Sequence, residues 1–111
     1  MLFRSDYCLS AHTAIGGLLE IAAADLDSAR DARNADAKTA AMLRFARIVV
    51  ATRGKVEDAD VAAIRAAGAT DAGIAEVVAI AALNVFTNLF NNVAGTDVDF
   101  PRVSARLAAA A

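Results

Sequence analysis

The sequence predicts an all-α protein, a compact bundle of about five helices. Strong helix formers, above all alanine, leucine, arginine and lysine, recur through the whole 111-residue chain. The one proline, Pro101, stands near the end, and no stretch alternates apolar and polar residues as a half-buried strand requires. A chain of this length forms one domain with one core. We expect that domain to span residues 1–101, followed by a C-terminal helical tail over residues 102–111.

The first two helices are predicted from their caps and their composition. Ser5 or Asp6 can cap a helix that runs to about Gly16 and Gly17, because short polar side chains accept hydrogen bonds from the first N–H groups of a helix. Residues 20–33 favour a second helix, with alanines on one side and charged residues on the other.

The third helix is predicted between residues 37 and 53. Asp36 can cap its start, and Gly54 stands where a C-terminal cap belongs. Its large apolar residues follow the 3–4 spacing of one helix face, which we expect to point into the core. These residues are Met42, Phe45 and Val49.

A short fourth helix and a long fifth one complete the predicted bundle. The fourth turns Val61 and Ile64 inward and is closed by Gly68. The fifth is the longest and extends from about residue 71 to about residue 93, with Gly95 beyond it. Beyond that glycine, we expect residues 97–101 to be extended. The residues that can cap the starts of the two helices are Glu57 or Asp58 and Thr70 or Asp71.

The composition narrows the classes of partner. Eleven basic and thirteen acidic residues give a net charge of −2, and no basic run is present, so we do not expect a nucleic-acid partner. A single cysteine cannot form an internal disulfide, which fits a reducing compartment and a cytoplasmic location. Hydrophobic residues make up 58% of the chain but aromatic residues only 5%, so an alanine-rich core supplies little apolar area. We therefore expect a homo-oligomer.

The longest uncharged stretch, residues 77–96, is long enough to cross a membrane. Five of its polar residues would be costly in lipid and are easier to accommodate in a buried helix. We therefore predict a soluble protein without a membrane partner. The five residues are Asn84, Thr87, Asn88, Asn91 and Asn92.

The best candidate for chemistry is Cys8 with His12. If Ser5 caps the helix, Cys8 is the third helical residue, where unpaired N–H groups and the helix dipole favour a thiolate. His12 lies four residues on and therefore on the same helix face, where its imidazole can accept the thiol proton or stabilise the thiolate. The structural alternative is a small buried cysteine beside a histidine without a chemical role.

A second candidate is a polar stripe on the longest helix, formed by Asn84, Thr87, Asn88 and Asn91 at 3–4 spacing. Asn84 and Asn88 in particular could line a cavity above Cys8. Alternatively, the stripe residues satisfy one another and the backbone in a helix contact.

Other polar residues are assigned structural roles. We interpret Tyr7 as a packing residue and the two carboxylates Asp97 and Asp99 as loop or capping residues. One histidine and one cysteine are too few for a zinc site, and there is no glycine-rich phosphate loop. We expect no metal and no cofactor.

The stretch around Cys8 resembles the second half of the Cys-x-x-Cys-x-x-x-His motif of alkylhydroperoxidase D-like proteins, in the peroxidase-related branch of the carboxymuconolactone decarboxylase superfamily. Further segments resemble that family in the same order, so that the resemblance extends from about Tyr7 to Pro101. The segments are 7–14, 43–46, 52–56, 66–71, 76–88 and 97–101.

The resemblance implies a helical fold and a thiol peroxidase. In the family, two cysteines cycle between dithiol and disulfide while a histidine and an upstream glutamate relay protons. Cys8 matches the second cysteine, His12 matches the histidine, and Ser5 stands in the place of the first cysteine. The glutamate would precede Met1, so we expect a fold that lacks the family's N-terminal helix, through a shortened protein or a start placed within a longer gene.

These departures leave three hypotheses. In the first, a single reactive Cys8 with His12 as its base reduces a hydroperoxide, and an external thiol resolves the sulfenic acid. The second is a decarboxylase-type enzyme of the same superfamily, which would need basic residues for an anionic lactone, although only Arg4 lies near the first helix. The third is a non-enzymatic helical assembly. The family resemblance implies a trimer or hexamer in all three, with a dimer as the alternative.

Overall fold

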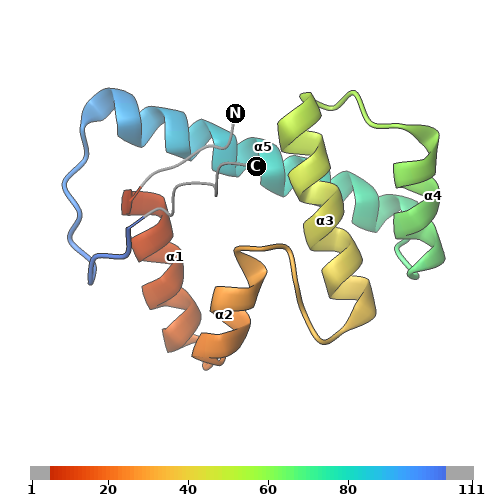
Figure 1. Ribbon diagram of the computed structural model, residues 1–111. Helices are drawn as coiled ribbons and strands as arrows, with labels where there is room; N and C mark the ends of the chain where they lie inside the picture. Colours follow the sequence, from red (N-terminus) through yellow and green to blue (C-terminus); the bar gives the residue numbers. More distant parts are fainter. Residues whose placement is uncertain (1–5, 105–111) are drawn as a thin grey trace, which may run out of the picture.

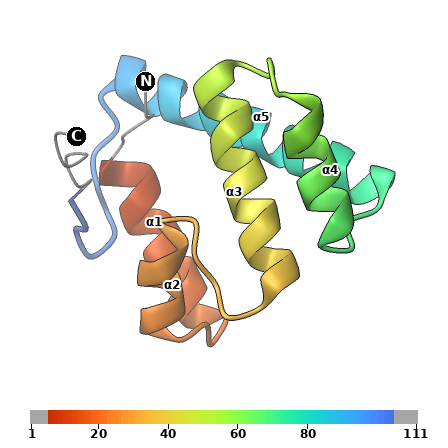
Figure 2. The same ribbon diagram turned by 45° about the vertical axis from the view of Figure 1, so that its right-hand side comes forward.

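The computed structural model describes residues 6–104, and their fold is an all-α bundle, as predicted. α1 packs against α2, α3 packs against α4, and α5 contacts both α1 and α3. Figures 1 and 2 show α5 passing behind α3 and continuing above α1, so that it joins the two pairs. The helices are α1 (Asp6–Leu18), α2 (Ala23–Ala29), α3 (Ala37–Thr52), α4 (Asp58–Ala66) and α5 (Asp71–Ala94).

The main apolar core lies between α3, α4 and the first half of α5. Its buried centre is formed by Phe45, Ile64 and Ala69. The prediction that Phe45 and Ile64 point inward is confirmed, since they are only 4% and 2% exposed. Partly buried apolar side chains surround this centre, namely Met42, Val49, Val56, Val61, Ile74 and Val77. Most of the other buried apolar residues in the described chain are alanines.

Side-chain caps begin three of the helices where the sequence predicts them. The Asp36 carboxylate accepts a hydrogen bond from the Thr39 N–H at 2.7 Å, and the Thr70 hydroxyl accepts one from the Gly73 N–H at 3.1 Å. Glu57 begins α4 in a reciprocal capping box with Asp60. The local signals for α3, α4 and α5 therefore agree with the fold.

The predicted extent of the second helix is wrong. Residues 20–33 were expected to be helical, but α2 covers only Ala23–Ala29. Glu20 (φ 60°) and Ala32 (φ 56°) flank it in the left-handed conformation, which cannot continue a right-handed helix. α3 ends in the same way, because the left-handed cap residue is Arg53 (φ 55°), one position before the predicted Gly54.

The segment after α5 returns along α1. Tyr7 and Phe100 meet edge to face with their ring centroids 5.9 Å apart, and the guanidinium of Arg102 lies 3.5 Å from the Asp6 carboxylate. Residues 102–104 are not helical, because the Val103 N–H donates to the Ser10 hydroxyl and not to a preceding carbonyl. The rest of the expected helical tail, residues 105–111, lies outside the described residues.

Candidate functional site

Cys8 lies at the contact between α1 and α5. It is the third described residue of α1 and is half-buried. The side-chain amide of Asn91, 83 residues away on α5, donates to Cys8 Sγ at 3.5 Å. A long-range polar contact therefore connects the sulfur to the longest helix.

His12 is attached to the backbone of Cys8. Its Nδ1 lies 2.7 Å from the Cys8 carbonyl oxygen. A carbonyl oxygen only accepts hydrogen bonds, so Nδ1 carries the hydrogen and Nε2 is the ring nitrogen left to accept a proton. The ring is exposed. This contact joins His12 to the backbone of Cys8, whereas the sequence predicts that the imidazole acts on the thiol.

The family's carboxylate has no counterpart in the described part of the chain. Among residues 6–104, no carboxylate is within ion-pair distance of His12. Glu20, the acidic residue closest along the chain on the C-terminal side, lies beyond the end of α1 in a left-handed conformation and is exposed. Ser5, in the place of the family's first cysteine, and Arg4 lie outside the described residues.

A hydroxyl fixes the orientation of the Asn91 amide. The Thr96 hydroxyl donates to Asn91 Oδ1 at 2.9 Å. With its oxygen engaged in this way, the amide presents its N–H groups to Cys8 Sγ. Thr96 therefore positions an amide N–H donor against the sulfur of Cys8.

The other members of the polar stripe bond within α5. Asn84 is exposed and donates to the Ile80 carbonyl at 2.8 Å, and Thr87 donates to the Asn84 carbonyl at 3.1 Å. Asn88 is 5% exposed and accepts from Asn92 at 3.4 Å. The sequence singles out Asn84 and Asn88 as lining a cavity, but the stripe residue that contacts Cys8 is Asn91, one turn beyond Asn88.

Sequence reasoning missed the buried hydroxyl of Ser10. This side chain is 0% exposed and binds the backbone of Val103. At 100° per residue, Asp6, Tyr7 and Ser10 lie on the side of α1 opposite to Cys8 and His12. The returning segment therefore covers the far side of α1, and Tyr7 has the predicted packing role. Asp97 and Asp99 are exposed in that segment, outside any helix.

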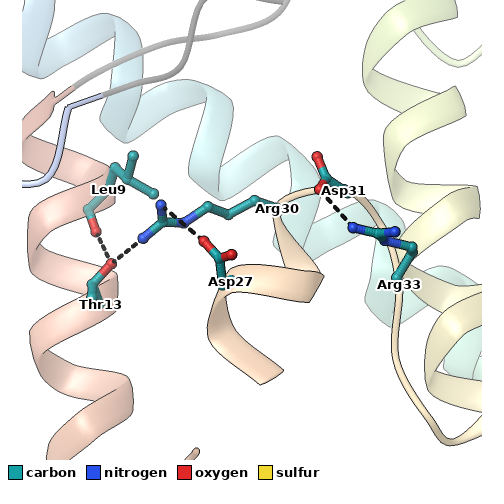
Figure 3. A network of polar contacts seen from close by, with 6 residues as sticks. All are labelled: Leu9, Thr13, Asp27, Arg30, Asp31 and Arg33. Atoms are coloured by element: carbon teal, nitrogen blue, oxygen red, sulfur yellow. Dashed lines mark hydrogen bonds and ion pairs between the residues drawn. The ribbon is translucent and has the colours of Figure 1, made fainter. Parts of the chain in front are cut away.

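A half-buried arginine from α2's end also reaches α1. Figure 3 shows Arg30 bonding to the Thr13 hydroxyl at 3.5 Å, while Thr13 itself donates to the Leu9 carbonyl at 2.7 Å. The same guanidinium lies 3.5 Å from the Asp27 carboxylate. Arg30 and Arg102 are thus basic residues beside α1 that the sequence did not reveal, and both are paired with carboxylates.

Metal-ligand geometry is not found in the described range, since residues 6–104 contain no group of three or more His, Cys, Asp or Glu side chains placed to hold an ion.

The chain matches no protein-family model, and comparisons with curated proteins and with solved structures gave no significant match.

Proposed function

We propose that the protein is a thiol-dependent peroxidase-like oxidoreductase that reduces hydroperoxides with Cys8 as its one reactive thiol. The observation that carries the proposal is the N–H donor of Asn91 at 3.5 Å from a half-buried sulfur. His12, held on the Cys8 carbonyl, adds a base within the same helical turn. The alkylhydroperoxidase D-like resemblance of the sequence supports the same reaction class.

In the first step, the Cys8 thiolate attacks the terminal oxygen of the hydroperoxide. An S–O bond forms, the O–O bond breaks, and the alkoxide takes up the proton that His12 accepted from the thiol at Nε2. The sulfur is oxidised to a sulfenic acid and the hydroperoxide is reduced to an alcohol. The amide of Asn91 stabilises the negative charge on the sulfur.

In the second step, an external thiol restores the cysteine. Its thiolate attacks the sulfenic sulfur and releases water, which leaves a mixed disulfide on Cys8. A second external thiol then attacks the mixed disulfide. This frees the reduced Cys8 and forms a disulfide between the two external thiols. Since the chain has only one cysteine, both electrons come from the external thiol. We place this reaction in the cytoplasm, where thiol reductants are abundant.

The test measures consumption of cumene hydroperoxide with dithiothreitol as reductant. Wild-type protein is expected to consume it and to form a dimedone adduct at Cys8 after one equivalent of peroxide, as read by mass spectrometry. Cys8→Ser should abolish both. His12→Ala should slow consumption while the helical circular dichroism stays unchanged. Equal turnover by Cys8→Ser and the wild type would refute the proposal, and an unmodified Cys8 would favour a non-enzymatic helical assembly.

A further inference from the structure

One side of α5 is apolar, exposed and continuous. α5 has seven exposed large apolar residues, and at 100° per residue all of them except Ile80 fall within one sector of about 140°. We define these six, which are 42% to 90% exposed, as the outer stripe of α5. Exposed alanines at positions 79 and 82 lie between them, and the exposed Ala75 precedes them by one turn. The six residues are Val78, Leu83, Phe86, Leu89, Phe90 and Val93.

The opposite side of the same helix is already used within the chain. Ile74 and Val77 pack against the core, and Ala81 and Asn88 are buried. No charged residue occurs between Glu76 and Asp97. A continuous exposed apolar patch on a protein marks a surface that another surface covers. Residues 6–104 bury one side of α5 and leave the outer stripe exposed.

The size of the outer stripe matches half of a protein interface. Phe86 and Phe90 are 63% and 61% exposed, which for aromatic side chains corresponds to about 250 Å² together. The six side chains expose roughly 600 Å². Each partner in a standard interface buries about 800 Å², and the alanines between the large residues account for much of the difference. This area is sufficient for a specific contact.

A membrane fits the outer stripe less well than protein does. α5 is long and apolar enough to cross a bilayer by length and composition, but its inner side packs on α3, which carries the exposed Arg44 and Arg47. A spanning α5 would carry those guanidiniums into hydrocarbon. A helix that lies on an anionic membrane needs lysine or arginine beside its apolar face. α5 contains neither, and the chain has a net charge of −2.

We propose that the outer stripe of α5 packs against a second copy of this chain. In a two-fold contact the same surface meets itself, so a charge near the axis would face its own copy. An uncharged stripe of alternating alanines and large side chains avoids that repulsion. The core also needs the additional burial, because Ile64 is the one large apolar side chain below 2% exposure in the described residues. The inference does not depend on the chemistry of Cys8.

The test is the mass of the full chain in solution by light scattering coupled to gel filtration. Wild-type protein should have at least twice the mass of one chain. Leu83→Glu and Phe86→Glu should each reduce the mass to that of one chain and retain the helical circular dichroism. The matched control is Leu18→Glu, which changes an 83% exposed leucine at the end of α1 and should leave the assembly intact.

A labelling experiment covers the case in which the charged variants do not fold. In a Cys8→Ser background, Phe90→Cys should react with a maleimide at least tenfold more slowly than Leu18→Cys, since the assembly covers only the first. A wild-type monomer, with or without flotation on neutral or anionic phospholipid vesicles, would overturn the proposal. So would dissociation by Leu18→Glu but not by Leu83→Glu, or equal labelling of the two introduced thiols.

Discussion

Ser10 and Val103 lie 93 residues apart and exchange hydrogen bonds through one buried hydroxyl. The Val103 N–H donates to Ser10 Oγ at 2.7 Å, and the hydroxyl donates to the Val103 carbonyl at 3.4 Å. The side chain of Ser10 is 0% exposed. This contact fastens the end of the described chain to α1, on the side away from Cys8.

Ser10→Ala should destabilise the protein by about 1–3 kcal/mol. The substitution leaves the backbone N–H of Val103 without its acceptor, and an unsatisfied buried donor costs about that much. Urea unfolding followed by circular dichroism gives the free energy of unfolding. The matched change Ser104→Ala, at an exposed position in the same segment, should have no measurable effect. If the two variants unfold at the same urea concentration, the hydroxyl does not fasten the segment.

The two adjacent glycines of α1 should respond differently to alanine. A Cβ at Gly17 meets nothing within 4 Å, so Gly17→Ala should stabilise the protein by about 0.5–1 kcal/mol through helix propensity. A Cβ at Gly16 would lie 2.7 Å from Leu26 Cδ2, and Leu26 would have to move away. Gly16→Ala should therefore lose that gain or destabilise the protein. Thermal unfolding measures the stability of both variants. An equal increase in stability for the two would contradict the close packing of α1 on α2.

The cap of α3 should make stability depend on pH. Hydrogen bonds from Thr39 lower the pKa of Asp36 below its ordinary value of 3.8. The bond from the Thr39 side chain has the larger effect and the bond from its backbone the next. A carboxyl group with a lowered pKa in the folded state stabilises that state above its unfolded pKa, and this contribution disappears as the pH falls through the folded value. The stability difference between wild type and Asp36→Ala should be full at pH 6 and shrink below about pH 3.8. A constant difference from pH 6 to pH 2.5 would contradict the cap.

Removing the amide next to the sulfur should slow the reactions of Cys8. Asn91→Leu keeps a side chain of similar size and deletes the N–H donor 3.5 Å from Sγ. A net hydrogen bond of about 1 kcal/mol corresponds to roughly a fivefold lower rate of alkylation by iodoacetamide at pH 7. Asn84→Leu is the control, because Asn84 bonds to its own helix. Equal rates for the two variants would show that Asn91 does not act on the thiolate.

Local sequence signals were sufficient to predict most of the helices. α3, α4 and α5 each carry a capping side chain at the start and apolar residues at 3–4 spacing, so neighbouring residues alone determine them. The second helix was overextended because Glu20 and Ala32 adopt left-handed conformations that ordinary L-residues rarely take. Nothing in their immediate sequence marks those two positions.

The candidate site was predictable only where it depends on helix periodicity. Spacing alone places His12 on the same face as Cys8, and the structure adds that its ring binds the Cys8 carbonyl. The approach of Asn91 to the sulfur depends on how α1 crosses α5, and the burial of Ser10 depends on the path of the returning segment. Contacts across 83 and 93 residues leave no local pattern in a single sequence.

The unequal packing of the two helix pairs divides the bundle into parts of different local stability. The large buried side chains belong to α3 and α4, whereas α2 has no buried residue and α1 buries only Ser10, Ala11 and Gly16. The free energy of the local opening that allows amide hydrogen exchange should therefore be lower in α1 and α2 than in α3. Cys8 lies in α1, so we expect local opening of α1 to set how often its sulfur is fully accessible.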